Sequence, residues 1–234
     1  MKLVKKLAPL YLLVIAAFLG LTFLGDRAVT AMAETAPIER RRVFVIDAGH
    51  GGMDGGATSC TGVLESQINL EIALRLDDLM HLLGHETVMI RTTDKSVYTQ
   101  GDTIAAQKVS DLKQRVKIVN ETNNAVLISI HQNIFSDGRY SGAQVFYVPD
   151  SESKALAEEL QSALVSTLNP GSNRKCKKAD GVYLMEHIDR PGVLVECGFL
   201  SNVEEEAKLR LPSYQQQICA VIAATLSAHF RAGE

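Results

Sequence analysis

Two histidines and two glutamates have the residue types and the spacing to form a catalytic metal site. His50, His131 and Glu196 each lie at the end of a short apolar run. Glu65 follows His50 after a glycine-rich stretch and stands where a helical pattern begins. The carboxyl ends of parallel strands meet at one edge of a sheet, so these four side chains could share one cleft.

Two imidazoles and a carboxylate form a ligand set that suits zinc and leaves a fourth position for water. We therefore interpret His50, Glu65 and His131 as the ligands of one Zn²⁺ ion. Such an ion lowers the pKa of bound water to ~7, and hydrolysis then needs a carboxylate outside the ligand set to move the proton. Glu196 is the candidate for this catalytic role.

Each of these residues also has an ordinary structural interpretation. A histidine at a strand end often does no more than satisfy its own hydrogen bonds. Glu65 could be an acidic residue placed favourably in the first turn of a helix. Glu196 could be a salt-bridged residue near a turn. Residue types and spacing alone leave both interpretations open.

Apolar runs alternate with helical patterns along the chain from residue 43 onward. Continuous apolar runs are typical of strands covered on both faces, and strand–helix alternation indicates a mostly parallel sheet. We expect an α/β fold in a single domain, with a twisted sheet of about six strands covered by helices. The expected strands are residues 43–48, 86–91, 125–130, 143–148, 181–185 and 193–195.

Several boundaries of these elements can be predicted from turn and capping residues. Residues 92–107 are polar and contain glycine, aspartate and threonine, so they are expected to form a loop. Ser151 is expected to cap a helix. Ser201 and Ser213 each precede an acidic or amide residue by three positions, which predicts capping boxes for two closing helices.

The first 33 residues differ in character from the rest of the chain. A basic start is followed by 19 uncharged, mostly apolar residues at 7–25 and by small residues at 31–33. This pattern predicts a signal peptide or a retained N-terminal membrane anchor, and either one places the body outside the cytoplasm. We expect residues 34–42 to form a linker and residues 43–232 to form the catalytic domain.

Charge and cysteine usage argue against two classes of function. The chain has a net charge of −3, and without its basic first 33 residues the net charge is −6. An acidic body offers no basic patch for phosphates, so nucleic acid is not an expected partner. The four cysteines have no CxxC spacing, so a zinc–thiolate site is not expected either.

The candidate site residues lie within a set of ordered motifs. These are DAGHGGMDGGA at 47–57, Glu65 with INL at 68–70, RTTD at 91–94, SIHQN at 129–133 and PGVLVECGFLSN at 191–202. In this order they resemble the zinc-dependent N-acetylmuramoyl-L-alanine amidases of the amidase_3 family, over nearly all of residues 43–232.

The resemblance implies zinc binding by His50, Glu65 and His131, with Glu196 as catalytic acid and base. It also implies peptidoglycan as substrate, cut between N-acetylmuramic acid and L-alanine. The chain departs from the family pattern at Ser66, where a lysine is frequent. Residues 131–142 are also too few for a helix that some relatives insert over the site, so an activating protein partner is one possible route of regulation.

A finer resemblance is to the sporulation and germination-specific cortex amidases, which act in muramic-δ-lactam formation. It rests on SIHQNIF at 129–135, GAQVFY at 142–147, SK at 153–154, NRK at 173–175 and VECG at 195–198. It implies spore cortex as the substrate and the forespore intermembrane space as the location.

Three alternatives to this cortex function stay open at the level of sequence. The protein could be a general wall-turnover amidase, a peptidoglycan-binding protein whose zinc site has little turnover, or a zinc peptidase that cuts within the stem peptide. Asn133 and Arg174 are candidate substrate-binding residues, and each could instead serve to fix a loop.

Overall fold

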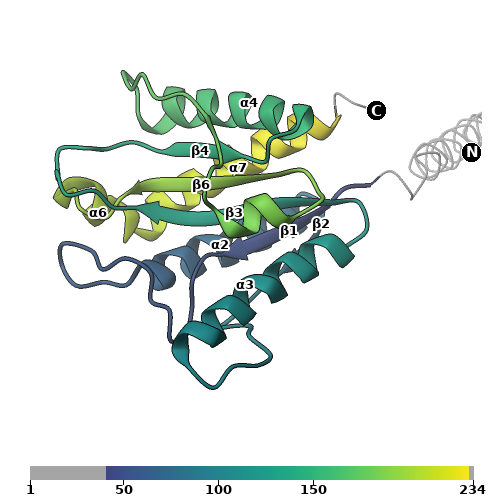
Figure 1. The fold of residues 1–234 in the computed structure, drawn as a ribbon. Helices are drawn as coiled ribbons and strands as arrows, with labels where there is room; N and C mark the ends of the chain where they lie inside the picture. The colour runs from purple at the N-terminus through teal and green to yellow at the C-terminus, as the bar shows by residue number, and fades with distance from the viewer. Residues whose placement is uncertain (1–40, 232–234) are drawn as a thin grey trace, which may run out of the picture. The chain divides into compact units, whose positions relative to one another are not determined.

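A six-stranded sheet with the order β2-β1-β3-β6-β4-β5 forms the centre of the computed structural model, which describes residues 41–231 (Figure 1). β1 pairs in parallel with β2 and β3, and β3 pairs in parallel with β6. β4 runs antiparallel to β6, and β5 runs parallel to β4. The strands are β1 (Val43–Ala48), β2 (Glu86–Met89), β3 (Ala125–Asn133), β4 (Gln144–Tyr147), β5 (Lys177–Lys178) and β6 (Gly192–Phe199).

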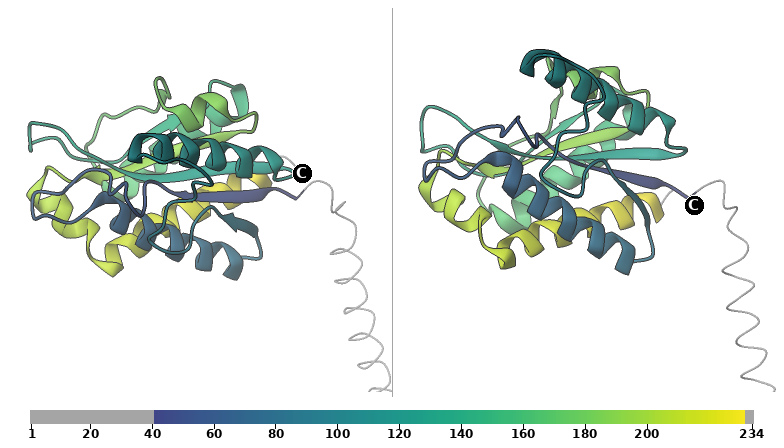
Figure 2. Two further views of the ribbon diagram at one scale, coloured as in Figure 1. Left: turned by 60° about the horizontal axis from the view of Figure 1, so that its bottom comes forward. Right: turned by 90° about the horizontal axis from the view of Figure 1, so that it is seen from below.

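Helices cover both faces of this sheet. α2, α4 and α7 lie together on one face, and α3 and α5 lie on the other (Figure 2). The expected α/β fold with a mostly parallel sheet is therefore confirmed. The helices are α2 (Glu65–Leu82), α3 (Ile104–Glu121), α4 (Ser151–Leu168), α5 (Tyr183–His187), α6 (Val203–Leu209) and α7 (Pro212–Arg231).

Two apolar clusters hold the layers together, one on each face of the sheet. The larger cluster joins alternate residues of β1, β3 and β6 to the inner faces of α2, α4 and α7. The smaller cluster joins the intervening strand residues to α3 and α5. Because both faces of the central strands are buried, these strands appear in the sequence as continuous apolar runs.

Two predictions of secondary structure were wrong. Residues 181–185 were expected to form a strand, but the chain forms the short helix α5, whose Leu184 and Met185 are buried in the smaller cluster. A run of four or five apolar residues fits either element, and periodicity cannot separate them. The expected loop 92–107 is shorter than predicted, because Thr103 caps α3 and the helix begins at Ile104.

The helix starts also differ from those predicted by caps at Ser151, Ser201 and Ser213. Asp150 rather than Ser151 caps α4, since its carboxylate accepts a hydrogen bond from the Ser153 amide at 2.8 Å. Asn202 rather than Ser201 caps α6 in the same way, through the Glu205 amide at 3.0 Å. The last helix begins at Pro212, a residue suited to a first helical position.

The predicted signal peptide or anchor, and most of the predicted linker, lie outside the residues that the structure describes. Within residues 41–231, no helix combines the length and the apolar character needed to cross a bilayer. The compact unit that carries the sheet begins at Arg42.

Candidate metal centre

Three neighbouring strands deliver the predicted site residues to one edge of the sheet. His131 of β3 is paired with Glu196 of β6 in the parallel register. Ala48, the last residue of β1, is paired with Ile130, so His50 follows just beyond the same edge. The register of β1, β3 and β6 therefore brings His50, His131 and Glu196 together, as the apolar runs predicted.

Glu65 lies between the two imidazoles and contacts both of them. Its Oε2 is 3.2 Å from Nε2 of His50, and its Oε1 is 2.9 Å from Nδ1 of His131. One donor atom from each residue lies within 4.8 Å of the other two. Glu65 is only 4% exposed, whereas both histidines keep some exposure. Two nitrogen donors and one carboxylate oxygen, this close and open on one side, fit a zinc ion.

The loop after β1 has an unusual backbone conformation, which lets it pass close to the side chains of Glu65 and His131. His50 itself has a positive φ of 62°, which is uncommon outside glycine. At Gly49, an added Cβ would lie 2.2 Å from the His131 ring, so only glycine lets the backbone pass there. Gly56 has φ 68°, and an added Cβ would meet Glu65 at 2.6 Å. The glycine-rich loop is thus required by the packing of the three candidate ligands.

Two buried arginines fix the backbone of this loop. Arg91 donates to the carbonyl oxygens of Ala48 at 2.7 Å and Gly49 at 3.0 Å. Arg115 donates to the carbonyl oxygen of His50 at 2.7 Å and forms an ion pair with Asp47. Burial alone would raise the pKa of Asp47, but the Arg115 guanidinium and other partners outweigh it and hold that pKa below its usual range.

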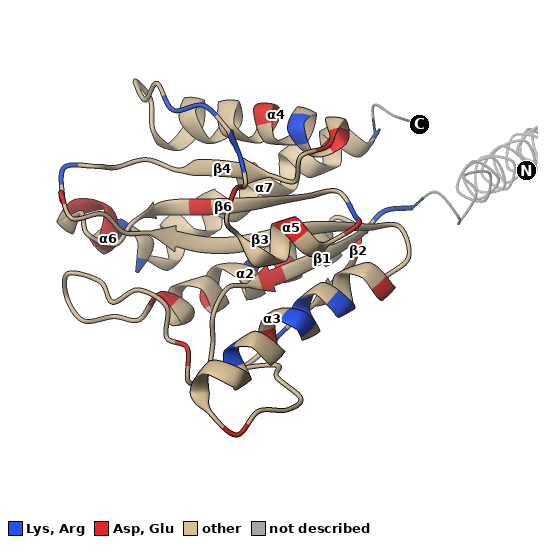
Figure 3. Cartoon of the chain, viewed as in Figure 1, with Lys and Arg blue, Asp and Glu red and all other residues tan. Residues whose placement is uncertain are grey.

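Asp54 is a candidate functional residue that sequence reasoning missed. Its Oδ2 is 3.0 Å from Nδ1 of His50 and 3.0 Å from Nζ of Lys108. Figure 3 shows basic residues along α3, the helix from which Lys108 and Arg115 reach the loop. A carboxylate on the second nitrogen of a ligating histidine orients the ring and raises its basicity. The available sequence signal was an acidic residue four positions after the histidine.

Glu196 lies beside the candidate ligands without contacting them through a hydrogen bond. Its Oε2 is shielded from solvent and has no hydrogen-bond partner among the described residues. Burial raises the pKa of Glu196 to about 7, with the Glu65 carboxylate adding to this effect and the two imidazoles opposing it. A carboxyl group with this pKa can both accept and release a proton near neutral pH.

A cavity of about 290 Å³ opens next to the two histidines, between the sheet edge and the α3 and α5 side. Leu112, Leu184 and Leu194 give it an apolar wall, while Lys108 and Asp54 lie at its polar side. His50 and His131 therefore face a space that a substrate group can enter.

The two candidate substrate-binding residues are placed differently. Asn133 ends β3, is half-buried and lies two residues beyond His131. Arg174 donates to the Ser141 carbonyl oxygen at 2.9 Å and lies 4.7 Å over the Phe199 ring, outside the cluster of His50, Glu65 and His131. Arg174 thus fixes a loop, and a substrate role for either residue stays a prediction.

Comparison with known proteins identifies the family of this chain. Residues 44–228 match the family described as N-acetylmuramoyl-L-alanine amidase. The germination-specific N-acetylmuramoyl-L-alanine amidase of Bacillus subtilis (strain 168) is 37% identical over 183 residues, which cover 77% of this chain and 76% of that protein.

Two solved structures share the fold. The CwlD amidase from Clostridioides difficile, in complex with the GerS lipoprotein, matches with a TM-score of 0.78 and 34% identity, over 82% of this chain and 100% of that one. An N-acetylmuramoyl-L-alanine amidase from Clostridium difficile 630 matches with a TM-score of 0.71 and 28% identity, over 83% and 100%. The chain therefore belongs to the zinc-dependent Amidase_3 family of N-acetylmuramoyl-L-alanine amidases.

Proposed function

We propose that this amidase binds one Zn²⁺ ion through His50, Glu65 and His131 and uses Glu196 as its catalytic acid and base. As a member of its family, the enzyme hydrolyses the amide bond between N-acetylmuramic acid and L-alanine in peptidoglycan. The observation that carries the residue assignment is the convergence of three donor atoms within 4.8 Å. They lie next to a Glu196 oxygen that has no hydrogen-bond partner within residues 41–231.

The zinc ion and the side chains of the site have different roles in hydrolysis. A bound zinc ion supplies a Lewis acid and makes hydroxide available near neutral pH. Glu196 accepts the proton of the attacking water and delivers it to the nitrogen of L-alanine as the C–N bond breaks. Asp54 orients the His50 ring. Arg91 and Arg115 fix the loop backbone at Gly49 and His50, which holds the candidate ligand His50 in position.

We further propose that the substrate is spore cortex, where removal of the stem peptide is the step towards muramic-δ-lactam. Similarity to the germination-specific amidase and to CwlD supports this assignment. Cell-wall amidases act outside the cytoplasm, and we propose that residues 1–33 deliver residues 43–232 there, as a secreted or anchored enzyme in the forespore intermembrane space. Since the CwlD structure contains the GerS lipoprotein, we also propose an activating protein partner for this chain.

Side-by-side digestion of cortex and vegetative sacculi, with zinc and then with a chelator, tests the proposed function. We expect release of intact stem peptides from cortex, with muramic acid left bare in the mass spectrum, and no release after chelation. Glu196→Gln should retain zinc and its fold but release no stem peptides. Continued release by this variant would refute the role given to Glu196.

The same digestion separates the alternative functions. Equal release from both walls would indicate a general turnover amidase, and cuts that leave L-alanine on muramic acid would indicate a zinc peptidase. Stoichiometric zinc without release from either wall would indicate a peptidoglycan-binding protein.

A further inference from the structure

Two aromatic side chains are exposed on the loop that follows β3. Phe135 is 52% exposed and Tyr140 is 49% exposed, and their rings meet edge to face with centroids 4.8 Å apart. Tyr140 also stacks on Phe199 with centroids 6.3 Å apart, and Arg174 covers the Phe199 ring. We call the exposed pair Phe135 and Tyr140 the aromatic platform.

The loop that carries the aromatic platform is held at several points rather than being free. The Phe135 amide donates to Oγ of Ser201 at 3.1 Å, and Asn202 donates to the carbonyl oxygen of Gly138 at 2.8 Å. At the far end of the loop, the Gly142 amide donates to the buried carboxylate of Glu205 at 2.8 Å. Since the turn after β6 and helix α6 hold this loop, it presents the two rings in a preset arrangement.

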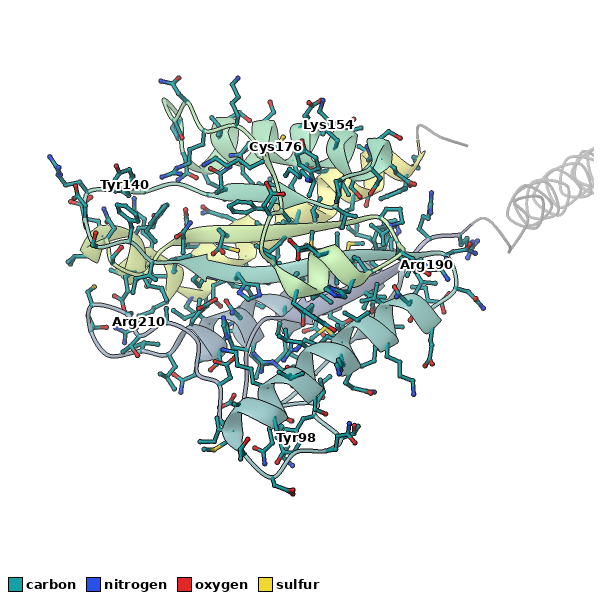
Figure 4. The ribbon with its side chains drawn as sticks, in the orientation of Figure 1. Tyr98, Tyr140, Lys154, Cys176, Arg190 and Arg210 are labelled. Carbon is teal, nitrogen blue, oxygen red and sulfur yellow. The ribbon has the colours of Figure 1, made fainter. Side chains whose placement is uncertain are left out.

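The aromatic platform lies on the loop that leaves β3 just beyond the candidate ligand His131. Asn133 pairs with Phe199 after a one-residue shift in the β3–β6 register that follows the His131–Glu196 pair. A rise of about 3.3 Å per strand residue places Asn133 roughly 7 Å beyond His131, and Phe135 follows two residues later. In Figure 4, Tyr140 lies at the end of the sheet opposite to Arg190, next to the ends of β3 and β6.

The position of this platform matches what a glycan strand needs. The muramoyl group must place its amide bond between the zinc ligands and Glu196, so the neighbouring sugars have to run along the adjacent surface. Aromatic faces pack well against the C–H faces of pyranose rings, and polar side chains such as Asn133 and Arg174 can bind hydroxyl and N-acetyl groups beside them.

We propose that the aromatic platform binds a sugar ring of the glycan strand, next to the muramoyl residue whose stem peptide is removed. This inference rests on the proposed function, since it assigns a binding site to the same substrate. It makes the enzyme prefer a polymeric strand over an isolated muramoyl peptide. A protein ligand for the platform would instead leave the purified enzyme indifferent to glycan length.

The test compares substrates of different glycan length. The double variant Phe135→Ala/Tyr140→Ala and the wild type are assayed on N-acetylmuramoyl-L-alanyl-D-isoglutamine and on a stem-bearing tetrasaccharide. The readout is the KM for the tetrasaccharide divided by the KM for the single-sugar substrate. We expect this ratio to be about tenfold higher for the double variant than for the wild type, with kcat on the tetrasaccharide little changed. The control Leu82→Ala/Leu83→Ala removes exposed apolar side chains from the end of α2 and should keep the wild-type ratio.

A ratio that stays at the wild-type value would overturn the proposal, as would an equal change of KM on both substrates. Should the double variant unfold, the single variants Phe135→Leu and Tyr140→Leu replace it, and Tyr140→Phe should restore the ratio. Titration of the chelated wild type and double variant with stem-free glycan tetrasaccharide gives a second readout, with about tenfold weaker binding expected for the variant. If the wild type cleaves neither substrate, either the activity or its activating partner is missing, and this titration, which needs neither, still decides on the platform.

Discussion

Asp54 offers the sharpest test of how the structure prepares the proposed zinc site. Its Oδ2 is shared between Nδ1 of His50 and Nζ of Lys108, at 3.0 Å from each. Asp54→Asn keeps the size of the side chain but removes the negative charge that holds the His50 ring. Loss of such an outer carboxylate typically lowers metal affinity 10- to 100-fold. Because the Asp54 side chain is 32% exposed, we expect the lower end, a loss of about tenfold in zinc affinity.

The zinc dissociation constant can be measured by competition with a chromogenic chelator, without reference to turnover. Thermal unfolding of the chelated protein serves as the control, and Asp54→Asn should unfold close to the wild type. The variant Lys108→Met separates two explanations. If Asp54 acts on His50, removal of Lys108 leaves the carboxylate free for the ring, and zinc affinity should hold or rise.

If Asp54 serves only to anchor α3 through Lys108, both variants should weaken zinc binding to the same extent. That result, or an Asp54→Asn dissociation constant within twofold of the wild type, would refute the reasoning.

Three further predictions concern the buried charges. Arg115→Met removes the ion-pair partner of the buried Asp47 carboxylate and should lower the free energy of unfolding by about 3–5 kcal/mol in denaturant titration. Lys117→Met, on the exposed face of α3, should change this free energy by less than about 0.5 kcal/mol. The pKa of Asp47 is lowered in the folded protein. The ionised Asp47 carboxylate therefore contributes to folding stability above its unfolded pKa of about 3.9, and this contribution is lost as the pH falls through its folded-state pKa. The destabilisation caused by Asp47→Asn should therefore be large at pH 7 and shrink steadily below pH 4; a constant difference would contradict this. The pKa of Glu196 is raised to about 7 in the folded protein. As the pH rises from about 4.5 to 7, the chelated wild type should therefore lose about 3 kcal/mol of stability relative to chelated Glu196→Gln. Above pH 7 this difference in stability should stay constant.

The central strands and the candidate ligands could be predicted from the sequence because their signals are local. Buried parallel strands need continuous apolar runs, and the residue after each run marks the functional edge of the sheet. The short strand β5 could not be found in this way, since Lys177 and Lys178 carry no apolar signal and lie at the sheet edge. Charged residues there oppose pairing with another chain.

The surroundings of the ligands depend on contacts that are distant in sequence. Arg91 and Arg115 reach loop carbonyl groups 42 and 65 residues away, at Gly49 and His50. A basic residue within a helical pattern usually faces solvent, so nothing in its local sequence marks a buried Arg115. Asp54 is close to His50 in sequence, but only the turn at Gly51 and Gly52 aims its carboxylate at the ring.

Arg91 and Arg115, which bind the loop carbonyl groups, also affect the stage at which the loop loses its conformational entropy. Their hydrogen bonds involve only protein atoms, so the backbone around His50 is ordered as the chain folds. The conformational entropy of the loop is therefore lost during folding, and zinc would bind to a site that is already preorganised. We therefore expect folding and metal loading to be separate events for this enzyme, unlike in small zinc domains that fold only around their ion.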